Sequence, residues 1–526
     1  MTALLHPGVY VQEVPGGVRS IEGVPTSTTI FVGETERGPT TATKIKGVSD
    51  YERLFGGYLR HPTTAPTRVC LRYAIDSFYR NGGSTAYVLR AVESTAVVAS
   101  RSYATHTGIL EASSPGTWGN QLYVLFGPST DGDTTRFRLL VYVYDLAARE
   151  HQFVEDWDRL SLNGSDENYV VDVLARSAYI VWNGHADFDL PADFTNETSS
   201  FTAANPADWD PTTVPAAKLA GGTLGEAVFS TSVLGDLLAQ LDGIDDAALI
   251  VAAPSAWLSS GDGHTGWFDA LRTYVDARPK LDLFLVGDLP RQAGDTATQA
   301  TSDTRTVVTG LTTSNMAASY WPHLEVADPV GAGRSATVHI PPSAAVAGLY
   351  ARTDSRRGVW KAPAGTEATI GGIVGLEHAL LDTHQDDLNP IGVNALRVIP
   401  GAGTVVWGSR TLRPSSEWRY VPVRRTAMFL RKSIYNGIQW AVFEPNDEDL
   451  WASLRATIGA FMNIQFRNGA FAGTSARDAY FVKVDAETTT EADQAAGIVN
   501  ILVGFAPLRP AEFVVVKLSQ KTASNS

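Results

Sequence analysis

Cysteine is almost absent from this chain, because Cys70 is the only one among 526 residues. A single thiol cannot close an internal disulfide bond, which excludes a small secreted fold held by disulfides and favours a reducing compartment. Cys70 precedes Leu71 on an expected helix, so we expect its thiol to be buried and inert.

Long apolar runs are also missing. No apolar stretch approaches the roughly 20 residues that a membrane-spanning helix needs. Residues 1–10 show neither the basic leader nor the apolar core of a secretory signal. The sequence therefore predicts a protein that is made in the cytoplasm, initially stays there and has no direct membrane partner.

Charge is sparse and mostly negative. Charged residues make up 19% of the chain, and 42 Lys and Arg against 56 Asp and Glu give a net charge of −14. This balance would repel a phosphate backbone, which argues against nucleic acid as a direct partner. The low charge indicates that part of the surface is buried against partners, and the length suggests roughly three to four domains.

Nucleotide-binding motifs fail on inspection. No Gly-Lys dipeptide occurs, which excludes a P-loop. Residues 261–266 fit the G-x-G-x-x-G pattern of dinucleotide-binding folds, with Asp282 downstream, but residues 254–260 separate these glycines from the preceding expected strand. We interpret this stretch as a surface loop followed by a helix start.

Other catalytic and metal-binding patterns are weak. Ser255, His264 and Asp288 could form a hydrolase set, but no G-x-S-x-G motif is present to expose the serine, and Asp288 fits a turn or cap. His378 and His384, near Glu377, are six residues apart and fall on different helical faces, so we expect surface histidines. The sequence thus predicts no catalytic, cofactor or metal site, and no enzyme.

Hydrophobic patterning predicts a mixed α/β chain. Residues 27–92 form a compact α/β unit, residues 93–244 are β-rich with long polar loops, and residues 245–330 alternate strand and helix as in a parallel doubly wound sheet. The expected strands are 28–32, 86–91, 121–126, 137–144, 247–253, 281–286 and 317–320, and the expected helices are 49–55, 67–79, 266–277 and 301–313.

Both ends of the chain carry a short apolar strand on a tether. The strand residues are Val9, Tyr10, Val11 and Val14 near the start, and Phe513, Val514, Val515 and Val516 in the expected strand 512–518. Such strands leave backbone groups unpaired until they join a sheet. Each could pair within its own domain, or could add to the sheet of a neighbouring subunit.

Three stretches carry a family resemblance. The first is residues 7–14, Pro-Gly-Val-Tyr-Val-Gln-Glu-Val, with 23–33 and Gly38-Pro39; the second is residues 340–365, from Ile-Pro-Pro-Ser to Lys-Ala-Pro-Ala-Gly. The third runs from Arg424 through Phe-Glu-Pro-Asn-Asp at 443–447 and Phe-Arg-Asn-Gly at 466–469 to Val484. In this order they resemble the contractile tail sheath family of phages, tailocins and phage-tail-like injection systems.

The resemblance implies a domain plan. Residues 1–20 and 511–526 would be arms exchanged between subunits, and 21–92 with 350–510 a discontinuous inner core. Residues 93–244 would be a β-rich outer insertion and 245–349 an α/β doubly wound domain. The middle of the chain matches no family motif, which leaves the role of the outer surface open.

A charged helix start follows the third stretch. Asn446 fits an N-cap, and Leu450, Leu454, Ile458 and Phe461 fall on one apolar stripe. The resemblance implies that a helix here faces an inner tube, with Asp447, Glu448, Asp449 and Arg455 as candidate contacts; a solvated face explains these charges equally well. The basic residues before it would pair with acids such as Glu444 or lie at a subunit interface: Arg424, Arg425, Arg431 and Lys432.

The resemblance implies a structural sheath subunit. It would polymerise with itself into a contractile cylinder around an inner tube, with baseplate and cap proteins as further partners and no cofactor. Assembly would take place in the bacterial cytoplasm, as part of a phage tail or related particle. The alternatives are a hydrolase-like enzyme on residues 245–330 and a non-contractile shell protein.

Overall fold

The computed structural model describes residues 20–58, 71–93, 95–103, 106–145, 150–183, 196–201, 205–223, 231–251, 262–292, 296–330 and 336–513. The chain forms two compact units. Unit 1 comprises residues 1–26, 354–362 and 420–526, and unit 2 comprises residues 27–353 and 363–419.

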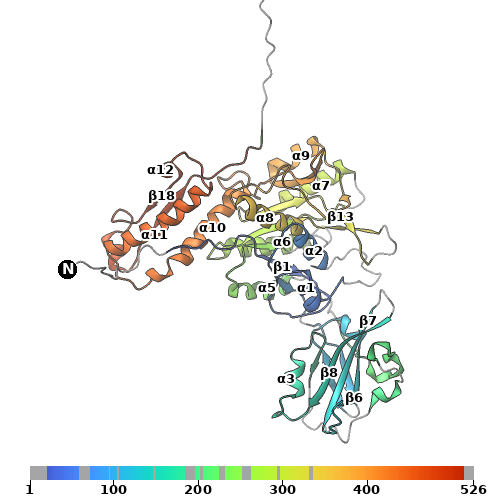
Figure 1. The fold of residues 1–526 in the computed structure, drawn as a ribbon. Coiled ribbons are helices and arrows are strands. Elements are labelled where there is room, and N and C mark those ends of the chain that lie inside the picture. The colour runs from blue at the N-terminus through green and yellow to red at the C-terminus, as the bar shows by residue number, and fades with distance from the viewer. Residues whose placement is uncertain are drawn as a thin grey trace, which may run out of the picture. The chain divides into compact units, whose positions relative to one another are not determined.

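Unit 2 contains an eight-stranded sheet in the order β17-β16-β12-β11-β10-β1-β3-β2 (Figure 1). Neighbouring strands from β3 to β16 pair in parallel, and the two edge strands, β2 and β17, pair antiparallel. The strands are β1 (Thr29–Gly33), β2 (Thr43–Ile45), β3 (Ala86–Arg90), β10 (Leu249–Val251), β11 (Phe284–Asp288), β12 (Ala317–Trp321), β16 (Val393–Ile399) and β17 (Gly403–Val406).

This topology confirms the doubly wound sheet but corrects its boundaries. β1 lies between β3 and β10, so residues 21–92 and 245–349 supply neighbouring strands of one sheet rather than two separate domains. The expected core segment 350–510 is also divided, because residues 363–419 belong to unit 2 and residues 420–510 to unit 1. Sequence periodicity identifies strands but carries no signal for which strands become neighbours.

The central strands are covered on both faces. Every residue of β1, β11 and β12 is buried, which explains why these strands read as continuous apolar runs. The helices of unit 2 outside the β-rich insertion are α1 (Val48–Phe55), α2 (Leu71–Arg80), α5 (Thr231–Ala239), α6 (Asp262–Ala277), α7 (Ala297–Gly310), α8 (Ser343–Arg357, its last residues counted with unit 1) and α9 (Asp382–Leu388). A second, three-stranded sheet contains β13 (Leu324–Ala327), β14 (Thr337–Ile340) and β15 (Gly375–Leu376).

Helices α2 and α8 approach closely through glycine. A Cβ atom on Gly348 would lie 2.3 Å from the backbone oxygen of Phe78. Gly82, just after α2, has a φ of +111°, and a Cβ there would lie 2.7 Å from the Cβ of Arg352. The glycines therefore set the distance between these two helices.

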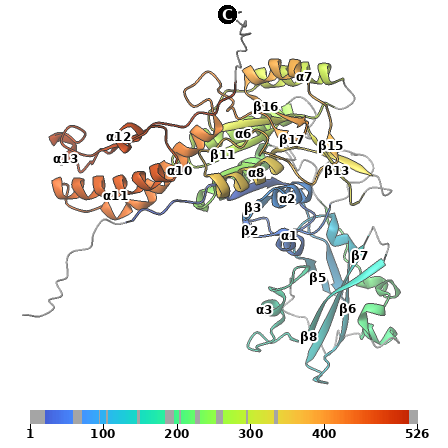
Figure 2. The same cartoon turned by 45° about the horizontal axis from the view of Figure 1, so that its top comes forward.

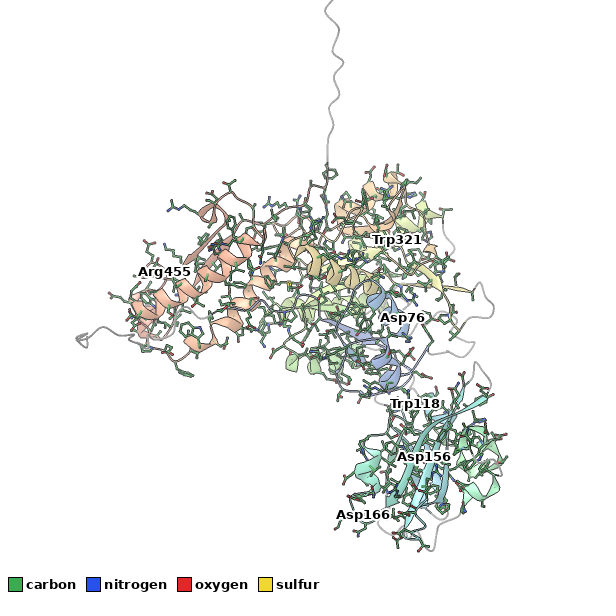
Figure 3. All side chains as sticks on the ribbon, in the orientation of Figure 1. Asp76, Trp118, Asp156, Asp166, Trp321 and Arg455 are labelled. Carbon is green, nitrogen blue, oxygen red and sulfur yellow. The ribbon has the colours of Figure 1, made fainter. Side chains whose placement is uncertain are left out.

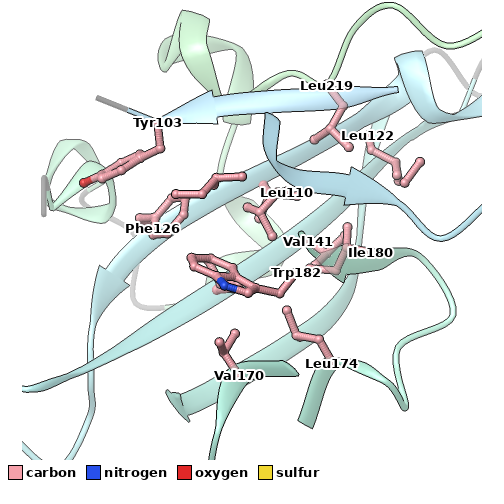
Figure 4. Close-up of a cluster of buried hydrophobic side chains, with 14 of the residues drawn as sticks. Tyr103, Leu110, Leu122, Phe126, Val141, Val170, Leu174, Ile180, Trp182 and Leu219 are labelled. Carbon is pink, nitrogen blue, oxygen red and sulfur yellow. The ribbon is translucent and has the colours of Figure 1, made fainter. Parts of the chain in front are cut away.

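The β-rich insertion forms its own module at residues 95–223. Its strands make two antiparallel three-stranded sheets, β4-β5-β9 and β6-β7-β8. The elements are β4 (Ser100–Tyr103), β5 (His106–Ala112), β6 (Leu122–Pro128), β7 (Arg136–Asp145), β8 (Glu150–Ser161), α3 (Val170–Leu174) and β9 (Ile180–Trp182). Side chains from both sheets, including Leu110, Phe126 and Trp182, fill one core (Figure 4).

The module begins and ends at one place. The backbones of Val97 and Thr223 exchange two hydrogen bonds, of 3.1 and 2.9 Å. Its contact with the rest of unit 2 includes the Arg37 guanidinium, whose carbon lies 4.1 Å from the centre of the Tyr179 ring, and Ser114, whose Oγ accepts from the Gly38 backbone at 2.9 Å. The strands of the stretch expected to be β-rich lie within residues 100–182, whereas residues 231–243 of that stretch are helical.

Unit 1 contains two long helices (Figure 2) and, in addition, a two-stranded sheet. The elements are α10 (Val421–Gly437), α11 (Glu448–Arg467), α12 (Ala476–Ala479), β18 (Tyr480–Lys483), α13 (Glu491–Ala495) and β19 (Leu502–Phe505). Their apolar side chains, among them Leu430, Ile458, Phe461 and Phe471, form a core that also includes Ile21. The start of the described chain thus packs with its end.

Candidate assembly surface

Most residues of the expected terminal strands lie outside the described residues. This applies to Val9, Tyr10, Val11, Val14, Val514, Val515 and Val516. Phe513 is described, and its side chain is 76% exposed. Neither Glu512 nor Phe513 is in a strand. Two other residues singled out from the sequence, Cys70 and Ser255, lie outside the described ranges.

The sheet of unit 1 consists of β18 and β19. They pair antiparallel from Tyr480 opposite Phe505 to Lys483 opposite Leu502. In the described part of the chain no third named strand joins them, so each strand is an edge. An edge of this kind presents backbone N–H and C=O groups to any further strand.

The two faces of this sheet differ. Tyr480, Val482 and Val503 pack against the core of unit 1. On the other face Phe481 and Leu502 are 53% and 52% exposed. The Phe481 ring lies against Gly504 so closely that a Cβ atom there would be 2.2 Å from it.

Helix α11 begins with exposed acidic residues. Asp447 is the N-cap, and its Oδ1 accepts a hydrogen bond of 3.0 Å from the Leu450 backbone. The prediction of Asn446 as the N-cap is therefore wrong by one residue. The side-chain oxygen of Asn446 does not cap the helix but accepts a hydrogen bond from Trp451 Nε1 at 2.9 Å. Glu448 and Asp449 occupy the first turn, where the helix dipole favours negative charge.

The apolar stripe of α11 faces inward as expected, since Leu450, Leu454, Ile458 and Phe461 are all buried. Arg455, labelled in Figure 3, lies on the same helix and is half-buried, whereas the three acids are exposed. Its guanidinium donates to the Val484 carbonyl and contacts Glu448 Oε1 at 3.2 Å. The exposed charge at this helix end is therefore mainly acidic.

Helix α10 carries a buried ion pair that the sequence analysis missed. The Arg425 guanidinium contacts both carboxylate oxygens of Asp354, at 3.0 and 2.6 Å. Arg425 therefore pairs within the chain, but with Asp354 rather than with an acid such as Glu444, which is exposed. A buried charge needs such a partner, but the two residues are 71 positions apart, and the sequence gives no signal for a pairing over that separation.

His264 and Asp288, the two described members of the alternative hydrolase set, lack the side-chain contact that a catalytic triad needs. His264 Nε2 lies 2.9 Å from the backbone oxygen of Asp288, not from its carboxylate. The carboxylate instead accepts hydrogen bonds from the Ser343 backbone, at 2.7 Å, and from its hydroxyl. Asp288 thus caps the start of α8, as one of the two sequence interpretations proposed.

Burial controls the ionisation of these two residues. It raises the pKa of Asp288 to about 8, although the hydrogen bonds from Ser343 favour the charged carboxylate. It lowers the pKa of His264 to about 4. Both side chains are closed off from solvent, so neither can reach a substrate in this arrangement.

The other histidines also serve the structure. His378 is buried, which corrects the expected surface position: it stacks on Trp321 at 5.5 Å. His384 Nδ1 accepts from the Leu381 backbone at 3.1 Å, at the start of α9. Within the described ranges no group of three or more His, Cys, Asp or Glu side chains is arranged to hold a metal ion.

Glu377 belongs to a buried polar cluster. Its carboxylate lies 2.6 Å from Arg291 Nε and 3.5 Å from His323 Nδ1. Burial alone would raise the pKa of Glu377, but His323 and Arg291 outweigh it and lower the pKa to about 2. This cluster ties β15 to the loop after β11 and to the loop before β13.

Two family models match the second half of the chain. Residues 269–412 match the phage tail sheath protein central domain, and residues 413–521 match the phage tail sheath C-terminal domain. The chain is 33% identical over 135 residues to the tail sheath protein of Vibrio phage KVP40, covering 25% of this chain and 20% of that protein. It is 29% identical over 178 residues to a protein described as a prophage major tail sheath protein of Pseudomonas aeruginosa, covering 33% and 44%. The matches thus span less than half the length of these relatives.

Solved structures share the fold over nearly the whole chain. The sheath of an extracellular contractile injection system, in the contracted state, has a TM-score of 0.58 at 23% identity and covers 99% of both chains. The contracted helical sheath of the anti-feeding prophage has a TM-score of 0.57 at 23% identity, covering 99% and 100%. A sheath tail protein of Desulfitobacterium hafniense has a TM-score of 0.56 at 14% identity, covering 95% and 100%.

None of the described helices combines the length and the apolar character that a bilayer crossing requires.

Proposed function

We propose that the whole chain is a structural sheath subunit, because residues 269–521 match two domain models of the phage tail sheath family. It polymerises with itself into a helical cylinder around an inner tube and drives that tube through a target envelope by contraction. The observation that carries the proposal is the pair of adjoining family matches, which begin at residue 269 within α6 and include all of α10 to β19.

Exchange of the terminal arms would hold the polymer together. We propose that β18 and β19 accept arm strands from neighbouring subunits, because both strands of this sheet are edges in the described chain. Main-chain hydrogen bonds would supply affinity, and the alternating side chains of residues 9–14 and 513–516 would set the register. Tethers at Gly16-Gly17 and around residues 507–510 would let subunits move without separating.

Contraction would be a repacking of rigid subunits rather than a chemical reaction. The two lattices of such a polymer differ in the interfaces that they bury, and bistable packing stores the work. A baseplate would trigger the change and a cap protein would close the far end, in a particle assembled in the bacterial cytoplasm. No cofactor takes part, so purified particles should contract without added nucleotide.

Arm removal tests the polymer. We expect the full chain to form striated hollow cylinders in negative-stain electron microscopy, and a chain lacking residues 1–20 and 511–526 to give dispersed particles. The trimmed chain should keep the circular dichroism of the full chain. Cylinders from the trimmed chain would contradict arm exchange, and dispersed particles from both chains, with the tube protein present as template, would contradict the sheath function.

Charge removal at α11 tests the contact with the tube. Asp447→Asn keeps an N-cap acceptor while removing the charge, and Glu448→Gln with Asp449→Asn complete a nearly isosteric neutral set. If these acids face the tube, the triple variant should alter co-sedimentation with tube protein several-fold while polymer formation stays normal. The matched control is Glu487→Gln, an exposed acid elsewhere in unit 1. Equal tube binding by all three proteins would show that the acids are only a solvated face.

A further inference from the structure

A short segment, residues 21–26, lies close to the start of the described chain and belongs to unit 1. It is in neither a helix nor a strand, so regular backbone pairing does not hold it. Four contacts instead join it to α10.

Two of these contacts are close approaches of apolar groups to glycine. A Cβ atom on Gly437 would lie 2.6 Å from Ile21 Cγ1, and one on Gly23 would lie 3.1 Å from the Phe429 ring. Ile21 itself is only 5% exposed. A larger residue at position 437 would therefore displace the segment.

The other two contacts are hydrogen bonds. The Val24 backbone N–H donates to Ser433 Oγ at 3.1 Å, and Arg425 Nη2 donates to the Thr26 carbonyl at 2.9 Å. Asp354 also binds the segment at Thr26. Its Oδ2 accepts a hydrogen bond from Thr26 Oγ1 at 2.6 Å, and the same carboxylate pairs with Arg425. The end of the segment is thus bound through both backbone and side chain.

The contact positions on the helix form one stripe. Residues 425, 429, 433 and 437 are each four apart and so lie on the same face of α10. Twelve residues of helix rise about 18 Å, and the five steps from residue 21 to residue 26 span about 17 Å when extended. The stripe and the segment match in length, and they run in opposite directions.

We propose that this stripe of α10 is an anchor for the base of the N-terminal arm. When a neighbouring subunit pulls on the arm, the contacts with α10 and with the Arg425–Asp354 pair would bear the force. The force would then not be transmitted along the chain to strand β1 of the large sheet. Arg425 and Ser433 act here as positioning residues for the arm. The tension role rests on the proposed sheath function, whereas the docking of residues 21–26 does not.

Hydrogen exchange tests the docking on the unassembled full chain. The test variant is Ser433→Ala with Gly437→Val, which removes the acceptor of the Val24 amide and crowds Ile21 without touching the arm or the buried ion pair. We expect the Val24 amide to exchange roughly tenfold faster or more, as the loss of a protecting hydrogen bond implies, while peptides of β11 and β12 stay unchanged. The matched control is Asn436→Ala, an exposed position on the same helix turn.

An unprotected Val24 amide in the wild-type chain would overturn the anchor, as would equal protection in the test variant and the control. Faster exchange across the whole of unit 1 would show that the double variant unfolds generally. In that case the exchange rate of the Val24 amide in the single variant Ser433→Ala would decide whether the segment docks on α10.

Shear of the assembled polymer tests the tension role. Polymers of the test variant should break under milder sonication than those of wild type or Asn436→Ala, with an unchanged length before shear. Release of the segment with unchanged shear resistance would overturn the tension role. A wild-type chain that forms no polymer would count against the proposed function and the tension role together, while the exchange result would still decide the docking.

Discussion

At the scale of the residue, the ionisable groups buried at the carboxyl edge of the large sheet serve folding. His264 and Asp288 stand where enzymes of this architecture place catalytic groups. Their hydrogen bonds instead join the start of α6 to the end of β11 and cap α8. Burial shifts their pKa values strongly, and perturbed values of this kind mark structural sites as well as functional ones.

The lowered pKa of His264 predicts acid sensitivity. Between pH 6.5 and about 4 the unfolded chain binds a proton at this residue that the folded chain does not, so stability falls as the pH drops through this window. Over the whole window the loss should be about 3 kcal/mol. His264→Gln keeps a donor for the Asp288 carbonyl but does not titrate, so its unfolding free energy should fall by about 3 kcal/mol less between pH 7 and pH 4.

Urea unfolding followed by tryptophan fluorescence at these two pH values measures the difference. Asn436→Ala, at an exposed position that carries no titratable group, serves as the control and should follow wild type. An identical pH response of His264→Gln and wild type would contradict the prediction.

At the scale of the element, glycines divide into those that allow close packing and those that do not. Gly348 faces the backbone of Phe78, whereas Gly459, inside α11, has nothing within 4 Å of an added Cβ. Gly348→Ala should therefore destabilise the chain by about 1–3 kcal/mol through overpacking. Gly459→Ala should stabilise it by about 0.5–1 kcal/mol through helix propensity.

Thermal unfolding of the two variants and wild type checks this pair. The same substitution gives opposite signs because the surroundings of the two glycines differ. Equal changes in melting temperature for the two variants would show that α2 and α8 can move apart without loss of stability.

Elements were predictable where local chemistry decides them. The strand expected at 317–320 is β12, Ala317–Trp321, and the helix expected at 301–313 is α7, which starts earlier because Thr296 caps it by accepting from Gln299. The strand expected at 281–286 starts later, at Phe284, since Leu281 has a φ of 43°. Long-range pairings such as Arg425 with Asp354 leave no local trace, so the sequence predicted the charges of the candidate surface but not their partners.

At the scale of the whole molecule, charge is divided unevenly along the chain. Residues 93–244 hold 21 acidic and seven basic residues, a balance of −14, while the remaining residues hold 35 of each sign. The β-rich segment thus carries the entire net charge of the chain. The remainder is neutral, so charge repulsion between copies of the proposed polymer would come mainly from the β-rich segment.

Excision of the β module should show how much its negative charge limits association of the chain. Val97 and Thr223 are hydrogen-bonded neighbours, so replacing residues 97–223 by a short linker leaves the connection to the rest of unit 2 short. We expect the circular dichroism of the remaining α/β elements to persist, because the core of the large sheet contains no module residue. The shortened chain loses ten negative charges net and should therefore associate more readily at low salt.

Light scattering at about 10 mM and about 300 mM salt measures the association of both chains. The Debye screening length is about 30 Å at the lower salt concentration and under 10 Å at the higher one, so charge repulsion acts at the first and is largely screened at the second. Association of the full chain should rise with salt, and that of the shortened chain should change less. A shortened chain that unfolds would show that the Arg37–Tyr179 stack and its neighbours are essential to the large sheet.

The docking of residues 21–26 on α10 also fixes an order of events during synthesis. Val24 and Ser433 are 409 residues apart, and β1 pairs with β10 across more than 200 residues, whereas the β module closes on itself between Val97 and Thr223. Domains that are complete fold while the ribosome is still adding residues to the chain. The module can therefore fold first, the large sheet later, and unit 1 only after α10 has emerged. Nascent chains would thus acquire their means of joining a polymer last, which delays self-association until translation is nearly finished.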